Sequence, residues 1–361
     1  MELLPKALGT RPRLAVEIRA EGVVAARAED AGGLLVAVSR ADVGEAELTP
    51  GLRAGNVTDR AAMTRAIRST LDAVGRGVDR IRDVTVIVPD AAVRVLLLDF
   101  DTLPTKVAEA LPVVRFRLKK LLPFEVENAV VSYQVMSSVK GLVTVLAVAI
   151  PREVLAEYEG LVTAAGYTPG AVLPSTLAAL AGLSAATSGP EESVASAVLV
   201  VNAGSQQVTT AIVKGGVLLL HRTLEMSVIP EGVHPEGYDR VDAEAAMQAT
   251  MVQDDVAAED ERRGGGGLQT VDLGSGSTAW EVAQAVSVAA AYFEDTLGGA
   301  PEVLLAVGTT SADSLERMLR VNGLDGLRVR EMMEPGMLAI GAATASVPRG
   351  WLAGVKGALT S

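Results

Sequence analysis

Two stretches of sequence, Leu14–Glu21 (LAVEIRAE) and Leu199–Gln206 (LVVNAGSQ), share one pattern and lie about half the chain apart. In each, an apolar segment typical of a buried strand ends at a polar residue, and a short turn follows. Two more short apolar segments come after each turn. These four segments span residues 22–28, 33–39, 208–213 and 217–224. The sequence therefore predicts a three-stranded unit that occurs twice.

Outward from these two units, the patterns predict alternating helices and strands. Residues 59–74 place Ala62, Ala66, Ile67 and Leu71 at helical spacing, which predicts an amphipathic helix after the first unit. Further strands are predicted at 83–88, 93–100, 128–135, 142–150 and 302–307, and further helices after Pro104, at 281–297, around 314–319 and from Pro335 through Ile340 to Ala345.

Composition excludes several classes of protein. The 361 residues contain no cysteine and only two histidines, which exclude a disulfide framework and disfavour a multi-histidine metal site or a Ser-His-Asp triad. The 44 acidic residues outnumber the 32 basic ones, so the net charge of -12 disfavours binding to nucleic acid. The length predicts two domains or one large bilobal body.

No segment has the character of a membrane span. Apolar runs such as 142–150 are about half the length that a bilayer requires. The charge-free stretch 160–189 contains Pro169 and Pro174, which favour a helix–loop–helix. The first twenty residues do not resemble a signal peptide. We therefore expect a cytoplasmic protein.

The duplicated unit of three strands and a helix is the ground plan of the actin-like, ribonuclease H-like fold. The predicted fold class is α/β: a duplicated fold of two lobes, with a small α+β subdomain inserted in the first lobe. The first lobe is expected at residues 1–190, with the insertion at about 80–150. The second is expected at 191–361, with a Gly-rich acidic excursion at about 252–277.

In this plan a nucleotide lies between the halves, and each half offers a turn to its phosphates. Backbone N–H groups in a Gly-rich turn bind anions, and an acidic residue at a strand end holds Mg²⁺ or water. The candidate residues are Asn202, Gly204, Ser205, Gln206 and Thr209 in the second half, Glu17, Arg19 and Glu21 at the equivalent place in the first, and Gly308, Thr309 and Thr310 for a base or ribose contact.

Charge makes the first turn a poor phosphate site. Glu17 and Glu21 repel a triphosphate, no lysine is near, and only Arg19 offsets them. A plain hairpin with solvated charges is the alternative interpretation of this turn. Asn202 lacks the negative charge that Mg²⁺ prefers, so the second turn favours phosphate contact over hydrolysis.

At 84–96 (VTVIVPDAAVRVL), followed by Leu103–Pro104, the sequence resembles the insertion subdomain of the PilM family, the actin-like cytoplasmic component of type IV pilus assembly. The resemblance continues through 121–127 (LLPFEVE) and the strand 130–135 (VVSYQV). Segments 198–210, 302–315 and 335–345 resemble the second phosphate turn, the adenosine strand and turn, and the closing helix of that family.

Several residues depart from the family pattern. PilM-like sequences carry Asp-Ile-Gly, serines and a lysine in the first turn, where this chain has Glu17–Glu21. Asn202 replaces an aspartate, Gly308–Thr309 replaces a Gly-Gly pair, and 227–232 stands where a Gly-Gly helix start is usual. The resemblance implies ATP and Mg²⁺ as ligands, and these departures favour a degenerate site in which their binding is weak or lost. An enzymatic activity is accordingly not expected, and no catalytic or metal-binding residue is assigned.

The resemblance also implies a partner. PilM-like proteins bind the cytoplasmic N-terminal tail of the membrane protein PilN in a groove between the first lobe and the insertion. This chain is therefore expected to be a protein-binding scaffold of the pilus inner-membrane platform, cytoplasmic and associated with the membrane through its partner. The basic residues of the helix at 110–122 suit an acidic partner or the anionic leaflet.

Three alternatives stay open at this stage. The first alternative is an active ATP-binding ATPase or kinase of the same superfold. The second is the cytoplasmic component of a type II secretion platform, and the third is a filament-forming protein. Fold does not decide among them, because function depends on the site.

Overall fold

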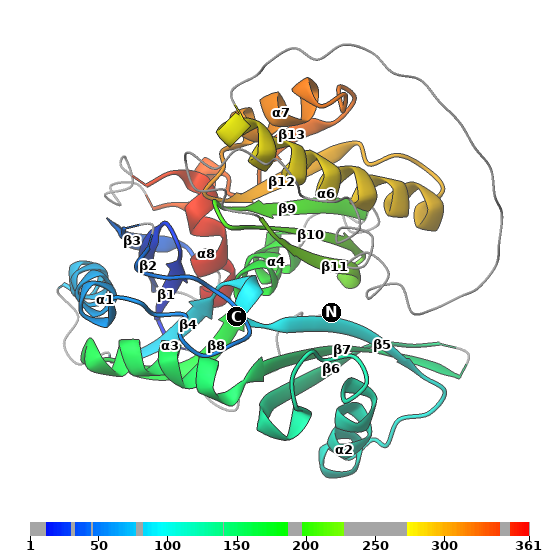
Figure 1. Ribbon diagram of the computed structural model, residues 1–361, viewed down its shortest axis with the longest axis horizontal. Coiled ribbons are helices and arrows are strands. Elements are labelled where there is room, and N and C mark those ends of the chain that lie inside the picture. Colours follow the sequence, from blue (N-terminus) through cyan, green and yellow to red (C-terminus); the bar gives the residue numbers. More distant parts are fainter. Residues whose placement is uncertain are drawn as a thin grey trace.

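The computed structural model describes residues 12–29, 33–44, 46–76, 82–139, 141–186, 197–226, 273–339 and 347–360, and it shows two lobes, each built on a five-stranded sheet (Figure 1). The first sheet has the order β3-β2-β1-β4-β8 and the second the order β11-β10-β9-β12-β13. In both, an antiparallel three-stranded meander continues into two parallel strands. The predicted duplication and the two-lobed α/β fold are therefore confirmed.

The strand bounds place the two units where the sequence pattern predicts them. The first sheet contains β1 (Leu14–Arg19), β2 (Gly22–Ala28), β3 (Leu35–Asp42), β4 (Asp83–Val88) and β8 (Thr168–Pro174). The second contains β9 (Ala197–Ala203), β10 (Gln207–Lys214), β11 (Val217–Glu225), β12 (Val303–Gly308) and β13 (Arg328–Glu331).

Helices cover both faces of the first sheet. α1 (Arg60–Val74) and α3 (Arg152–Ala164) pack together on one face, and α4 (Ser175–Ala186) and α8 (Ala353–Leu359) pack together on the other. α1 begins where Asp59 accepts a hydrogen bond from the Ala62 N–H, which caps the helix. α8 approaches α4 so closely that a Cβ at Gly357 would lie 1.9 Å from the Ala178 carbonyl oxygen. Only glycine permits this crossing.

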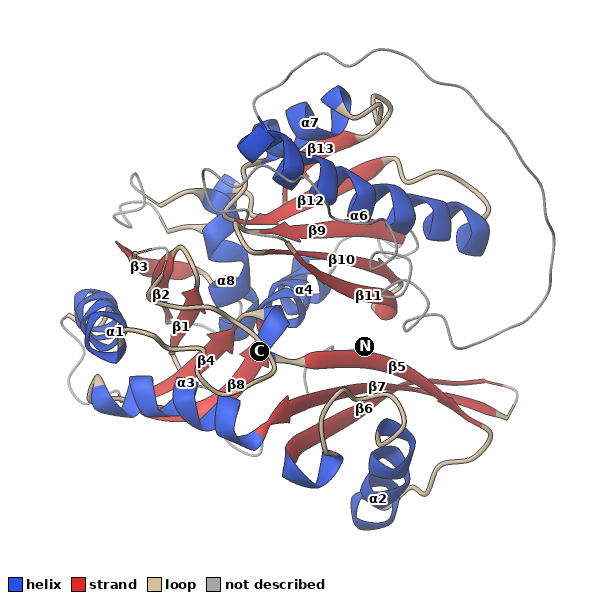
Figure 2. Cartoon of the chain, viewed as in Figure 1, coloured by secondary structure: helices blue, strands red, loops and turns tan. Residues whose placement is uncertain are grey.

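In the second lobe, α6 (Leu273–Leu297) lies against β9 and β10, and α7 (Ala312–Val321) packs on α6 and β13 (Figure 2). The core of this lobe forms between the apolar face of α6, including Val282 and Val286, and the sheet. The short turn of 3₁₀-helix at Arg349–Leu352 then leads into α8 and returns the chain to the first lobe.

The insertion subdomain is a three-stranded antiparallel sheet of order β5-β7-β6 with one helix (Figure 2). It contains β5 (Arg94–Phe100), α2 (Val107–Leu118), β6 (Ala129–Val139) and β7 (Leu142–Pro151). Two segments lie elsewhere than the predicted limits imply. β4 falls within the predicted insertion at 80–150 but belongs to the first-lobe sheet, and α8 falls within the predicted second lobe at 191–361 but packs on the first lobe.

Two predictions of secondary structure were wrong. The stretch 160–189 contains the strand β8 between its helices. Within the described part of the chain, β8 pairs with β4 alone, and such an edge strand accommodates Pro169 because its outer side needs no hydrogen bonds. The segment from Pro335 begins as a 3₁₀ turn, and the Leu338 bridge to Leu35 ends it, so residues 335–339 are not the start of an α-helix.

Some predicted features lie outside the described residues. They are the segment 227–232, most of the excursion at 252–277 and the end of the closing helix at 340–345. Residues 273–277 of the predicted excursion belong to α6. Within the described ranges, no helix is long and apolar enough to cross a membrane.

Candidate functional site

Polar side chains gather where the carboxyl ends of the parallel strands meet, which is the usual ligand position in α/β sheets. In the first lobe, Glu17 and Arg19 lie at the end of β1, Asp90 follows β4, and Ser175 follows β8. Asn202 near the end of β9 faces them from the second lobe, and it hydrogen-bonds to Arg19. The sequence-predicted residues Glu17, Arg19 and Asn202 are thus brought together.

Arg19 is the centre of this group. Its guanidinium pairs with Glu17 Oε1 at 2.5 Å and donates to Ser175 Oγ at 3.0 Å and to Asn202 Oδ1 at 3.2 Å. Arg19 is only 4% exposed, and Glu17 is fully buried. A buried ion pair of this kind depends on such additional hydrogen bonds, because both charges have lost their water. Arg19 thereby joins the two lobes directly.

Asp90, Ser175 and Thr176 complete the network, and sequence reasoning missed all three. The Ser175 hydroxyl donates to Glu17 Oε1 at 2.6 Å and accepts from Asn202 Nδ2 at 2.9 Å. Thr176 donates its N–H to Asp90 at 3.1 Å and its hydroxyl to the same carboxylate. Ser175 comes directly after β8 and Asp90 comes two residues after the end of β4, and these positions behind the parallel strands are the signal that could have identified them.

Glu17 does not offer a metal site. Burial raises the pKa of its carboxyl above the ordinary 4.5, against the opposing effects of Arg19 and Ser175. Its second oxygen, Oε2, has no hydrogen-bond partner, and a Cβ at Gly354 of α8 would lie 2.3 Å from it. This oxygen is therefore covered by the α8 backbone. In the described part of the chain, no group of three His, Cys, Asp or Glu side chains is arranged to hold a metal. These residues do not fit Mg²⁺.

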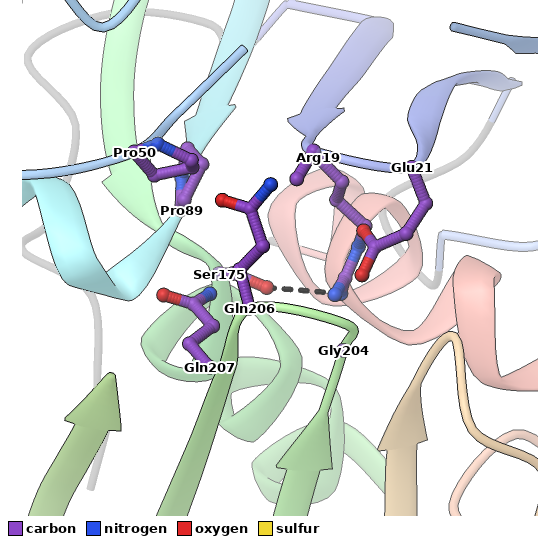
Figure 3. A pocket seen from close by; sticks show the side chains of 9 residues that line it. Arg19, Glu21, Pro50, Pro89, Ser175, Gly204, Gln206 and Gln207 are labelled. Carbon is purple, nitrogen blue, oxygen red and sulfur yellow. Dashed lines mark hydrogen bonds between the residues drawn. The ribbon is translucent and has the colours of Figure 1, made fainter. Parts of the chain in front are cut away.

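The second-lobe turn is occupied by a side chain of the first lobe. Glu21 Oε1 accepts a hydrogen bond from the Ser205 N–H and a longer one, of 3.4 Å, from the Thr309 hydroxyl. Gly204 lies so near that a Cβ there would be 2.7 Å from the same oxygen. Figure 3 shows Arg19 and Glu21 extending from the first-lobe turn toward the turn that carries Gly204.

The loop at 308–310 is folded onto the end of β9. The N–H groups of Thr309 and Thr310 donate to the Ala203 carbonyl at 2.9 and 3.2 Å. Gly308 has a φ of 101°, and a Cβ there would lie 2.5 Å from the same carbonyl oxygen. This loop had been predicted to contact a base or ribose, and its two threonine N–H groups are engaged within the protein.

Little space remains between the two turns. The cavity between them has a volume of about 10 Å³, and its lining includes Arg19, Glu21, Ser175, Gly204, Gln206 and Gln207 (Figure 3). That is roughly enough for one water molecule, whereas pockets for small ligands measure about 300 Å³ or more. Thr209 does not line this cavity, because it is buried in β10 with its hydroxyl 3.0 Å from that of Thr223.

The two turns differ in backbone although their lengths are equal. Six residues separate Glu17 from its strand partner Val24, and six separate Asn202 from its partner Thr209. In the first lobe the ladder continues to the Arg19–Gly22 pair, so only two residues form the turn. In the second lobe it stops at the Ala203–Val208 pair, and a hydrogen bond of 3.0 Å from the Gly204 N–H to the Gln207 carbonyl closes the turn around Ser205 and Gln206. The first turn is therefore a tight hairpin.

No protein-family model matches the sequence, and no curated protein sequence matches it significantly. Among solved structures, a chain of the PilM-PilN type IV pilus biogenesis complex superimposes with a TM-score of 0.69 at 18% identity, over 97% of this chain and 99% of that one. The cytoplasmic domain of EpsL, an inner membrane component of the Vibrio cholerae type II secretion system, gives 0.45 at 13% identity over 96% and 94%.

A Bacteroides thetaiotaomicron protein with an actin-like ATPase fold and unknown function gives a TM-score of 0.44 at 9% identity, over 97% of each chain. Of these three similarities, the one with a TM-score of 0.69 is strong enough to establish the fold. The chain has a PilM-like, actin-like fold, and this agrees with the two sheets of identical strand order.

Proposed function

We propose that this protein is the PilM-like scaffold of a type IV pilus inner-membrane platform, and that it binds the cytoplasmic N-terminal tail of a PilN-like membrane protein. The observation that carries this proposal is the end-to-end likeness to a chain of the PilM-PilN complex, over 97% of this chain and 99% of that one. A likeness of that extent includes the insertion subdomain as well as both lobes. We place the protein at the cytoplasmic face of the inner membrane, held there by its partner.

The site between the lobes supports a scaffold rather than an ATPase. At the place where a nucleotide would bind, Arg19 of the first lobe hydrogen-bonds to Asn202 of the second. Beside it, Glu21 of the first lobe accepts a hydrogen bond from the second-lobe turn. The cavity beside them is far smaller than an adenine nucleotide, and the carboxylate at the end of β1 is paired with Arg19. We therefore propose that ATP and Mg²⁺ bind weakly or not at all and that the protein does not hydrolyse ATP.

An extended tail suits the strands of this part of the molecule. Among the described strands, β6 pairs with β7 alone and β8 with β4 alone, so each stands at the edge of its sheet. An extended peptide binds such an edge through main-chain hydrogen bonds, and side-chain pockets supply selectivity. We propose that the tail binds at the junction of the first lobe and the insertion. At this junction β7 of the insertion ends at Pro151, and the chain continues into α3 of the first lobe.

A synthetic peptide with the sequence of the cytoplasmic N-terminal tail of a PilN-like protein tests the proposal. Calorimetry is expected to show saturable binding that a scrambled peptide lacks. Amide hydrogen exchange is expected to slow in β6 or β8, while α7 in the second lobe serves as the internal control. Binding of the equivalent tail from a type II secretion platform instead, or no binding of either, would contradict the proposal.

A further inference from the structure

We infer that the Glu21 carboxylate takes the place of a phosphate group in the second-lobe turn, so that the two lobes are held together without a nucleotide. The inference deepens the proposed function, because it names what occupies the same site. It assigns an anion-binding turn at Gly204–Ser205, with Thr309 as a further donor, and the class of ligand that this turn accepts is a carboxylate or a phosphate.

The donors at this turn are those that an anion needs. The Ser205 N–H points at Glu21 Oε1, and the Thr309 hydroxyl reaches the same oxygen at 3.4 Å. Hydrogen bonds from neutral donors to an ionised acceptor are stronger than neutral pairs. Gly204 lets the carboxylate approach closely, because a Cβ there would lie 2.7 Å from the bound oxygen and the Glu21 side chain would have to shift. A glycine beside an anion has the same role in phosphate-binding loops.

Glu21 reaches the turn because the first-lobe turn is tight. With the ladder continued to the Arg19–Gly22 pair, Ala20 and Glu21 stand at the tip of the hairpin, and the tip faces the second lobe. An open loop with small residues at this position would leave room for a phosphate. The hairpin supplies a side-chain anion instead.

Two further contacts make the same connection between the lobes. Arg19 bonds to Asn202 at 3.2 Å, and the Ala91 N–H donates to Gln207 Oε1 at 2.7 Å. Glu21, Arg19 and Gln207 thus join the lobes at three points around a cavity with room for about one water molecule. Side chains of the chain itself therefore hold the two turns together.

The test uses the full chain with Glu21→Ala and Glu21→Gln, and inorganic phosphate as the probe. Glu29→Ala is the matched control, because Glu29 pairs with Arg27 at the surface of the same lobe. We expect Glu21→Ala to lower the melting temperature by a few degrees. We expect phosphate, at constant ionic strength, to restore it and to bind this variant roughly tenfold more tightly than it binds the wild type.

Glu21→Gln keeps an acceptor oxygen for the Ser205 N–H and loses the charge, so its melting temperature is expected between those of the wild type and Glu21→Ala. Phosphate is expected to leave the wild type and Glu29→Ala unchanged. A second arm with MgATP is expected to shift Glu21→Ala no more than phosphate does, because the cavity beyond the turn has no room for a nucleoside.

Two results would overturn the inference. One is that Glu21→Ala has the same melting temperature as the wild type and binds phosphate no more tightly. The other is that the wild type binds phosphate or MgATP as tightly as Glu21→Ala does. Neither measurement uses the partner peptide, so failure here is distinguishable from failure of the proposed function.

Discussion

The turns of the two lobes begin from the same strand pattern and have opposite chemistry. In the first lobe, the residues from Glu17 to Glu21 form a tight hairpin that carries three charged side chains. In the second, the residues from Asn202 to Gln206 carry no charged side chain, and the Ser205 N–H donates to Glu21 of the first lobe. The two halves share one strand arrangement, and the Glu21 carboxylate of the first half accepts a hydrogen bond from the backbone of the second.

This difference teaches that the two halves are complementary rather than equivalent. A pair of equivalent turns needs a ligand between them, because both present donors to the same anion. Here the first lobe supplies the anion at Glu21 and the cation at Arg19, and the second lobe supplies Ser205 N–H and Asn202. If Glu21 takes the place of a phosphate, as we infer, such lobes come together without a nucleotide.

The largest expected effect is loss of the Arg19 charge, which would leave Glu17 buried beside an aliphatic chain. Arg19→Met is expected to reduce the free energy of unfolding by about 3–5 kcal/mol, since removal of one member of a buried pair leaves an uncompensated charge. Urea unfolding measures it. Arg320→Met, which breaks an exposed pair with Glu316, is the control and should cost less than about 1 kcal/mol.

The double variant Glu17→Gln/Arg19→Met sharpens the same comparison. It removes both charges and is expected to recover part of the lost stability, because no buried charge remains unpaired. A double variant less stable than Arg19→Met would mean that the ion pair is not what Arg19 contributes.

The second expected effect concerns the loop that closes over the second-lobe turn. Gly308→Ala combines a φ of 101° with a Cβ 2.5 Å from the Ala203 carbonyl oxygen, and it is expected to cost about 3 kcal/mol. Gly323→Ala is the matched control, because Gly323 has a φ of 83° with nothing near its Cβ position, and about 1 kcal/mol of strain is expected. Equal losses in denaturant unfolding would show that the loop is not packed on β9.

The smallest expected effect is a pH dependence that belongs to the first lobe. The folded-state pKa of Glu17 is raised above 4.5, so its contribution to stability is fully present below that pH and is lost as pH rises through the folded-state pKa. The stability of the wild type relative to Glu17→Gln should therefore fall from pH 4.5 toward neutrality, by about 1.4 kcal/mol for each unit of elevation. A difference that is flat, or that grows with pH, would contradict the raised pKa.

The fold was predictable because its signals are local. Apolar segments separated by short turns located the two meanders, and helical spacing located α1. β8 was not predictable in the same way, because its prolines are typical of loops and only pairing with β4 makes it a strand. The packing of α8 on the first lobe likewise depends on long-range contact at Gly357.

The candidate site was predictable in part. The strand-end positions of Glu17, Arg19 and Asn202 follow from the repeat, and the structure brings them together. The destination of Glu21 does not follow, because the sequence does not show that the first ladder continues to Gly22 and aims the hairpin at the other lobe. Asp90 and Ser175 depend on the parallel arrangement of β1, β4 and β8, which unites residues far apart in the chain.

The most direct test of the account is titration of the wild-type protein with MgATP, followed by calorimetry and by the melting temperature. A ligand at a hundred times its Kd stabilises a fold by about 2.7 kcal/mol, which shifts the melting temperature by a few degrees. The account predicts no heat and no shift at millimolar MgATP, since Glu21 and Arg19 already join the lobes. Saturable heat with a shift of several degrees would contradict it.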